Sequence, residues 1–141
     1  MNIKDITKNK TNEKGLRKNS KSLNIIKGSI ISIVITLIGL IIFSIILANT
    51  NISENIMLPV VTSIAAISIL VGSIISISKI EKKGILNGAL VGLIYILVIY
   101  ILSSIVNGKF EININSIILI VTSIIAGMLG GVIGVNIKNK K

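Results

Sequence analysis

The sequence predicts an all-α, polytopic membrane protein, a bundle of four transmembrane helices. Four stretches of about twenty residues contain no charged residue, namely 28–48, 57–78, 85–106 and 116–137. At about 1.5 Å of rise per residue, a helix of this length covers about 30 Å, the thickness of the hydrocarbon core of a bilayer. Hydrophobic residues make up 52 % of the 141 residues, and the mean hydropathy is +0.93. Apolar runs this long lack the alternation that is typical of barrel strands.

The first span follows a long polar leader. Residues 1–26 are rich in Lys and Asn and poor in apolar residues, so we expect a disordered basic tail. The run 28–48 is too long for the core of a cleavable signal peptide, and no small-residue cleavage spacing follows it. This span is therefore expected to be retained, and residues 27–141 are expected to form one membrane domain.

The other three spans are separated by short polar connections. Residues 49–56 and 107–115 connect spans at one end of the predicted bundle, and residues 79–84 connect them at the other. Pro59 lies in the first turn of the second span, where its missing N–H has no helical partner to lose. Connections of this length join antiparallel neighbours.

The distribution of charge predicts the orientation. Fourteen of the fifteen Lys and Arg residues lie at the same end of the spans, and Lys109 alone lies at the other. Because basic residues in short loops mark the cytoplasmic side, both termini are expected in the cytoplasm, with Glu54 and Glu111 outside. The basic tail is interpreted as a topology determinant or, alternatively, as a contact with anionic lipid. It has no aromatic residue and no RNA- or DNA-binding motif, so nucleic acid is not expected as a partner.

The chain also resembles two copies of one helical hairpin. Lys27-Gly28 opens the first half and Lys83-Gly84 opens the second, while the sequence at 61–66 recurs with one change at 121–126. Both halves begin on the same side, so these would be parallel repeats related by an axis along the membrane normal. The alternative is chance similarity between spans that are all rich in isoleucine.

Small residues recur at four-residue spacing in every span. Spacing of four places them on one helix face, where missing side chains let two backbones approach closely. The glycines expected to pack helices are Gly84, Gly88 and Gly92 in the third span, and the pairs Gly127 with Gly131 and Gly130 with Gly134 in the fourth. Weaker stripes are Gly28, Ser32 and Thr36 in the first span and Ser68, Gly72 and Ser76 in the second. Packing within the bundle is the first interpretation; homo-oligomerisation and a substrate path are the alternatives.

Polar side chains within the spans are few. Asn87 and Asn136 lie near the cytoplasmic ends and Tyr95 lies near mid-span, so these three are candidates for hydrogen bonds between helices. Tyr100 and Phe110 are interpreted as packing or interface residues. The chain has no Cys and no His, and no span contains an ionisable acid or base of the kind that proton relays use. We therefore expect no catalytic residue, no metal site and no cofactor.

Residues 83–95 and 127–136 resemble an uncharacterised family of small four-span membrane proteins of clostridia, bacilli and their relatives. The resemblance extends over residues 27–138. It implies a bacterial cytoplasmic membrane and a domain of unknown function, and it carries no catalytic residue. With the residue patterns, it leads us to expect a non-enzymatic accessory or scaffold protein that acts through helix–helix contacts with itself or another membrane protein. A subunit of an oligomeric channel or small transporter is the alternative.

Overall fold

The computed structural model describes residues 2–80 and 83–140, and this part of the chain is helical. The helices are α1 (Ile3–Asn49), α2 (Met57–Ile77), α3 (Gly84–Asn107) and α4 (Ile114–Asn139), with a short 3-10 turn, η1 (Glu54–Ile56), before α2. All four long helices are long and apolar enough to cross a membrane. The predicted all-α, four-span membrane protein is therefore confirmed. The last three helices begin and end within two residues of the predicted spans.

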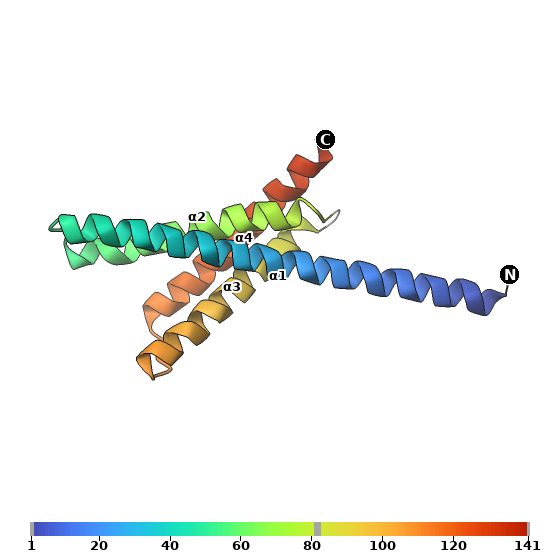
Figure 1. Ribbon diagram of the computed structural model, residues 1–141, viewed down its shortest axis with the longest axis horizontal. Coiled ribbons are helices and arrows are strands. Elements are labelled where there is room, and N and C mark those ends of the chain that lie inside the picture. Colours follow the sequence, from blue (N-terminus) through green and yellow to red (C-terminus); the bar gives the residue numbers. More distant parts are fainter. Residues whose placement is uncertain (1, 81–82, 141) are drawn as a thin grey trace.

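The leader differs from its prediction. It is not disordered in the structure: α1 begins at Ile3 and continues without a break into the first span (Figure 1). The residues before the span include no proline and one glycine, Gly15. Extending an existing helix avoids the unfavourable nucleation step, so a polar segment attached to a stable span can remain helical. The side chains of this extension are exposed as far as Ser20.

The four helices form two antiparallel hairpins that cross each other. In Figure 1, α1 and α2 lie side by side, and the α3–α4 hairpin crosses them at a wide angle. Helices α2 and α3 are both central, because each of them contacts all three other long helices. One end of the bundle carries the α2–α3 connection and the C-terminus; we call it the basic end. The far end carries the α1–α2 and α3–α4 connections.

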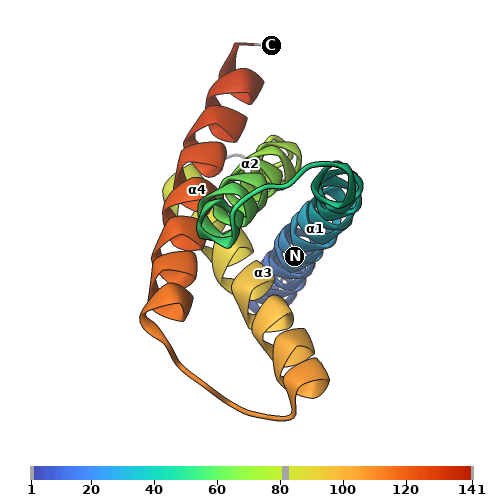
Figure 2. The same cartoon turned by 90° about the vertical axis from the view of Figure 1, so that its left-hand side faces the viewer.

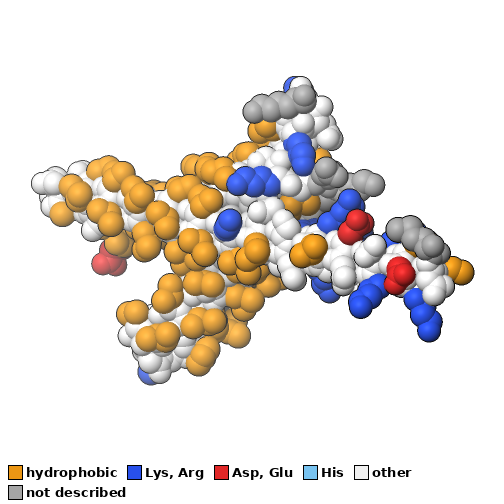
Figure 3. Space-filling model, turned by 45° about the vertical axis from the view of Figure 1, so that its right-hand side comes forward, with side chains coloured by type: hydrophobic (Ala, Val, Ile, Leu, Met, Phe, Trp, Pro, Cys, Tyr) orange, Lys and Arg blue, Asp and Glu red, His pale blue; other side chains and the backbone are white. Residues whose placement is uncertain are grey.

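Charge and apolar surface separate along the molecule. Lys and Arg side chains gather toward the extended part of α1 and the end of α4, whereas apolar side chains predominate on the visible surface of the two hairpins (Figure 3). Lys82 and Lys141, which entered the charge prediction, lie outside the described residues. On one part of the α1 surface, long apolar side chains such as Leu37, Ile41 and Ile45 are more than half exposed, as expected of a surface that faces lipid.

The core lies in the half of the bundle nearest the basic end. Its apolar members form two clusters, one around Ile77 and Val91 and one around Ile69 and Tyr95. The buried polar residues are nearly all small: Ser29, Ser32, Thr36, Ser68, Ser73, Ser76, Asn87 and Ser123. Helices in lipid associate through close packing and hydrogen bonds rather than through burial from water, and small residues suit both.

The two hairpins are packed through similar small-residue contacts. A Cβ added at Gly72 would meet Gly28 and Ser32, and one added at Gly131 would meet Gly84 and Gly88. Gly84 and Gly88 follow Gly28 and Ser32 by 56 positions, but Gly131 follows Gly72 by 59, whereas 121–126 follows 61–66 by 60. The contact of Gly131 is therefore one position out of the register of the sequence repeat, and the duplication stays a prediction.

Candidate functional site

The tightest helix contact is the crossing of α3 and α4 near the basic end. A Cβ added at Gly88 would clash with the backbone of Gly127, and one added at Gly127 would clash with the backbone of Gly88. A Cβ at Gly84 would lie 2.5 Å from the carbonyl oxygen of Gly131, and one at Gly92 would clash with the carbonyl of Ser123. The two backbones are therefore in direct contact over two turns, and even one methyl group at these glycines has no space.

The glycines of α4 face two different helices. Gly127 and Gly131 contact α3, whereas a Cβ at Gly130 would lie 2.6 Å from the carbonyl oxygen of Leu70 in α2. Gly134 likewise faces α2 at Ile74. The two overlapping pairs thus let α4 approach both neighbours at once. Each glycine within the four apolar segments has an atom of another helix within 4 Å of its added Cβ, so the stripes are used inside the bundle.

The three polar candidates have different surroundings. Tyr95 is buried, and its hydroxyl lies 3.0 Å from the hydroxyl of Thr36 in α1. Asn87 is also buried, with 2 % of its surface exposed. Asn136 has an exposed side chain on α4. The structure therefore places Tyr95 at an interhelical hydrogen bond, as its mid-span position predicts, and places Asn136 outside the bundle interior.

We expect the Thr36–Tyr95 hydrogen bond to contribute about 0.6 kcal/mol of coupling, the average for such bonds between membrane helices. The measurement is a double-mutant cycle with Thr36→Val and Tyr95→Phe, followed by unfolding in mixed detergent micelles. Tyr100→Phe on the same helix is the matched control, and its effect on the free energy of unfolding should simply add to that of Thr36→Val. If the effects of Thr36→Val and Tyr95→Phe on the free energy of unfolding are additive, this hydrogen bond does not stabilise the fold.

The buried hydroxyl groups are paired, mostly within their own helices. Ser32, Thr36, Ser68 and Ser123 each donate to the carbonyl four residues earlier, at distances of 2.6–2.9 Å. Ser73 donates across the bundle to the carbonyl of Gly127 at 2.8 Å, and Ser76 donates to the carbonyl of Asn24. The hydroxyl oxygen of Ser29 lies 3.1 Å from the carbonyl oxygen of Ile25 in its own helix and 3.3 Å from that of Val91 in α3. Among the described residues, no buried side-chain nitrogen or oxygen lacks a partner.

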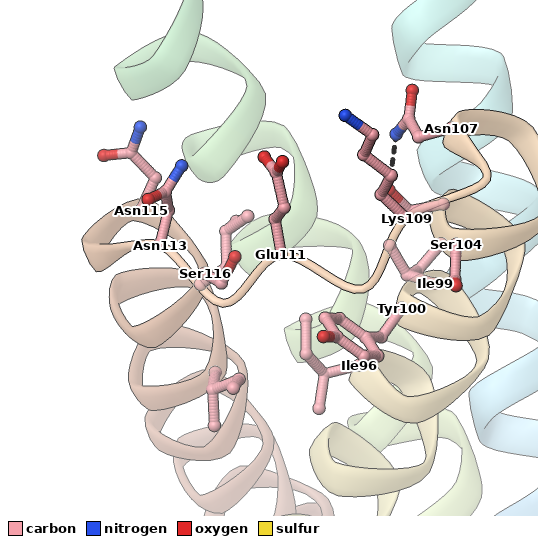
Figure 4. Close-up of a pocket in the computed structure, with 13 residues that line it drawn as sticks. Ile96, Ile99, Tyr100, Ser104, Asn107, Lys109, Glu111, Asn113, Asn115 and Ser116 are labelled. Carbon is pink, nitrogen blue, oxygen red and sulfur yellow. Dashed lines mark hydrogen bonds between the residues drawn. The ribbon is translucent and has the colours of Figure 1, made fainter.

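A second feature is a cavity at the far end, between α3 and α4. Beyond their crossing these helices diverge, and a long connection bridges their separated ends (Figure 2). The space between them has a volume of about 410 Å³. Figure 4 shows its rim, where polar side chains from both helices and from the connection surround the opening. The lining residues are Ile96, Ile99, Tyr100, Ser103, Ser104, Asn107, Lys109, Glu111, Asn113, Asn115, Ser116, Leu119 and Ile120.

The cavity is apolar at depth and polar at its rim. Ile96, Ile99 and Leu119 are half-buried, whereas Asn107 near the end of α3 donates to the hydroxyl of Ser103 at 3.2 Å. Tyr100 contacts Phe110 of the connection, with ring centroids 5.8 Å apart. The sequence prediction missed this cavity. The sequence does contain a sign of it: glycine is absent from 93–107 and 114–126. Bulky Ile and Leu side chains there hold the two helices apart.

Comparison with known proteins gives one match. Residues 21–134 match the family described as "Protein of unknown function (DUF3792)". No curated protein matches the chain, and no solved structure matches it.

Proposed function

This chain belongs to that family of unknown function, and on this premise we propose that it is a non-enzymatic accessory protein of a membrane, acting through helix–helix contacts with another membrane protein. The observation that carries the proposal is the divergence of α3 and α4. The glycine faces that could attract a partner are used inside the bundle, whereas the far-end cavity leaves both polar and apolar side chains of α3 and α4 accessible.

The chemistry of the cavity suits a transmembrane helix. Its rim offers serine hydroxyls and asparagine amides, groups through which membrane helices associate. Its floor offers isoleucine and leucine side chains for packing. An added helix would therefore find both components of a membrane interface, in the half of the bundle where α3 and α4 do not fill the space between them.

The proposed location is the bacterial cytoplasmic membrane, with both termini in the cytoplasm. The location rests on the resemblance to membrane proteins of clostridia and bacilli. The orientation rests on the fourteen basic residues at one end of the spans, because such residues are retained on the cytoplasmic side. The far-end cavity then opens toward the outside.

Photocrosslinking in intact cells tests the proposed contact. A benzophenone side chain at Ile120, which lines the cavity, should give one discrete adduct whose partner peptide, read by mass spectrometry, is a transmembrane segment of another protein. The matched control is the same side chain at Leu129, which is exposed on α4 near the basic end and lies outside the cavity. It should crosslink only lipid. Lipid adducts at both sites would contradict the proposal.

The alternative is a subunit of an oligomeric channel or small transporter. The row of buried hydroxyl groups in α1 and α2 favours it, although these hydroxyls already donate to carbonyls. Adducts between two copies at Ile120 would support this alternative. Purified protein in liposomes separates the two further: an accessory protein leaves an imposed proton or sodium gradient as stable as in empty liposomes, whereas a channel dissipates it.

A further inference from the structure

A second cavity, of about 460 Å³, lies at the basic end of the bundle. Four basic side chains line it: Arg17 and Lys21 of α1, Lys79 after α2, and Lys138 of α4. Ser20 and Asn24 add neutral polar groups, and Ile80 is a buried apolar member of the lining. Residues far apart in the sequence are thus brought together by the fold. No carboxylate is among the described residues of this lining.

Helix α1 is fixed against α2 immediately beside this cavity. The hydroxyl of Ser76 donates to the carbonyl of Asn24, and Gly28 packs against Gly72 and Ser76. Arg17, Lys21, Asn24 and Gly28 follow at intervals of four, three and four residues, which places them on one face of the helix. The face of α1 that contacts α2 inside the bundle therefore continues as the basic wall of the cavity.

The position of the cavity selects the class of ligand. Basic side chains from three parts of the chain surround one space, and such a space attracts an anion. Ile26 of α1 and Ile137 of α4 are exposed apolar side chains directly adjacent in sequence to the basic end of the spans. The charges consequently lie at the depth of lipid headgroups, beside surfaces that suit acyl chains.

We propose that this cavity binds the phosphate headgroup of an anionic phospholipid from the leaflet at the basic end. The volume is within the range of small-molecule sites, so it accommodates a headgroup. The site differs from a general attraction of the basic tail to lipid, because Lys79 and Lys138 come from elsewhere in the chain. It is also independent of the far-end cavity and of the function proposed for it.

Native mass spectrometry of the full chain in mild detergent tests the site, with phosphatidylglycerol and phosphatidylcholine as probes. The wild-type protein should retain phosphatidylglycerol in preference to phosphatidylcholine. Lys21→Gln with Lys138→Gln should weaken phosphatidylglycerol binding about 30-fold, the equivalent of about 1 kcal/mol for each basic residue near anionic lipid. The matched control, Lys8→Gln with Lys140→Gln, removes the same charge from α1 and from the residue directly after α4, outside the cavity, and should change binding about threefold or less.

Each other outcome overturns the proposal. Unchanged binding in the Lys21 and Lys138 double variant would show that the cavity is not the site. Equal losses in both double variants would show a general charge effect. Displacement of phosphatidylglycerol by inorganic phosphate would assign the cavity to a soluble anion instead of a lipid. Circular dichroism of the variants verifies that the helices remain, and the four replaced side chains lie on the surface or only partly buried.

Discussion

Replacing Gly88 with leucine is expected to separate α3 from α4 and to cause the largest loss of stability of any single substitution considered. The first atom of the new side chain would already clash with the carbonyl of Gly127 and lie 2.9 Å from the Cα of Gly131. These are backbone atoms and cannot rotate away, so a helix must shift. Overpacking typically costs about 1–3 kcal/mol, and a clash with backbone atoms places this substitution toward the upper end. Thermal unfolding in mild detergent, followed by circular dichroism, measures the loss.

The controls for this substitution use the same chain. Gly15→Leu adds the same side chain to α1, where nothing lies within 4 Å of the added Cβ, and it should leave the unfolding temperature unchanged. Ile101→Phe enlarges an exposed side chain of α3 and should also be mild. Gly127→Leu, on the other side of the crossing, should match Gly88→Leu. An unfolding temperature for Gly88→Leu equal to that of Gly15→Leu would show that close approach is not what the glycine provides.

Labelling with a membrane-impermeant thiol reagent should give an all-or-none result for the proposed orientation. The natural chain has no cysteine, so each introduced cysteine reports alone. Ser22→Cys and Asn139→Cys should resist the reagent in intact cells, and Asn51→Cys should react, because positive residues keep both termini in the cytoplasm. All three side chains are exposed in the structure, so protection can come only from the membrane.

The same three variants contain their own control. In permeabilised cells all of them should react, which verifies that the cysteines are present and reactive. Labelling of Ser22→Cys or Asn139→Cys in intact cells would reverse the orientation and would place the far-end cavity in the cytoplasmic half of the membrane. Reaction at both ends would indicate a mixture of orientations.

The sequence was sufficient to predict the four spans, because bilayer thickness and the absence of charge define them independently of any tertiary contact. It also singled out Gly127 with Gly131 and Gly130 with Gly134 as pairs of packing glycines. Which neighbour each face meets depends on the crossing of the two hairpins, and helical spacing alone does not determine that. The absence of glycine from 93–107 and 114–126 was a local sign of the divergence of α3 and α4. Where the far-end cavity opens depends on how these two helices cross, which no local pattern specifies.

The N-terminal leader shows a different limitation of prediction from sequence, because here the local composition predicts too little structure. Its composition predicts disorder when residues 1–26 are considered alone, but the covalent continuation into α1 changes the physical situation. Helix extension adds one hydrogen bond for each residue ordered, without a new nucleus. The basic cavity, in turn, required Lys79 and Lys138 to be placed beside Arg17, which is a consequence of the fold and not of spacing along any single helix.

The local pairing of the buried hydroxyl groups has a consequence for biogenesis. Ser32, Thr36, Ser68 and Ser123 already bond to carbonyls of their own helices, so those hydroxyls need no neighbouring helix when they first enter lipid. Each hairpin can thus leave the insertion machinery and reside in the bilayer by itself while the remainder is still being synthesised. Docking of the two hairpins then becomes a later step, in which mainly Ser73 and the Thr36–Tyr95 pair form bonds that insertion did not supply.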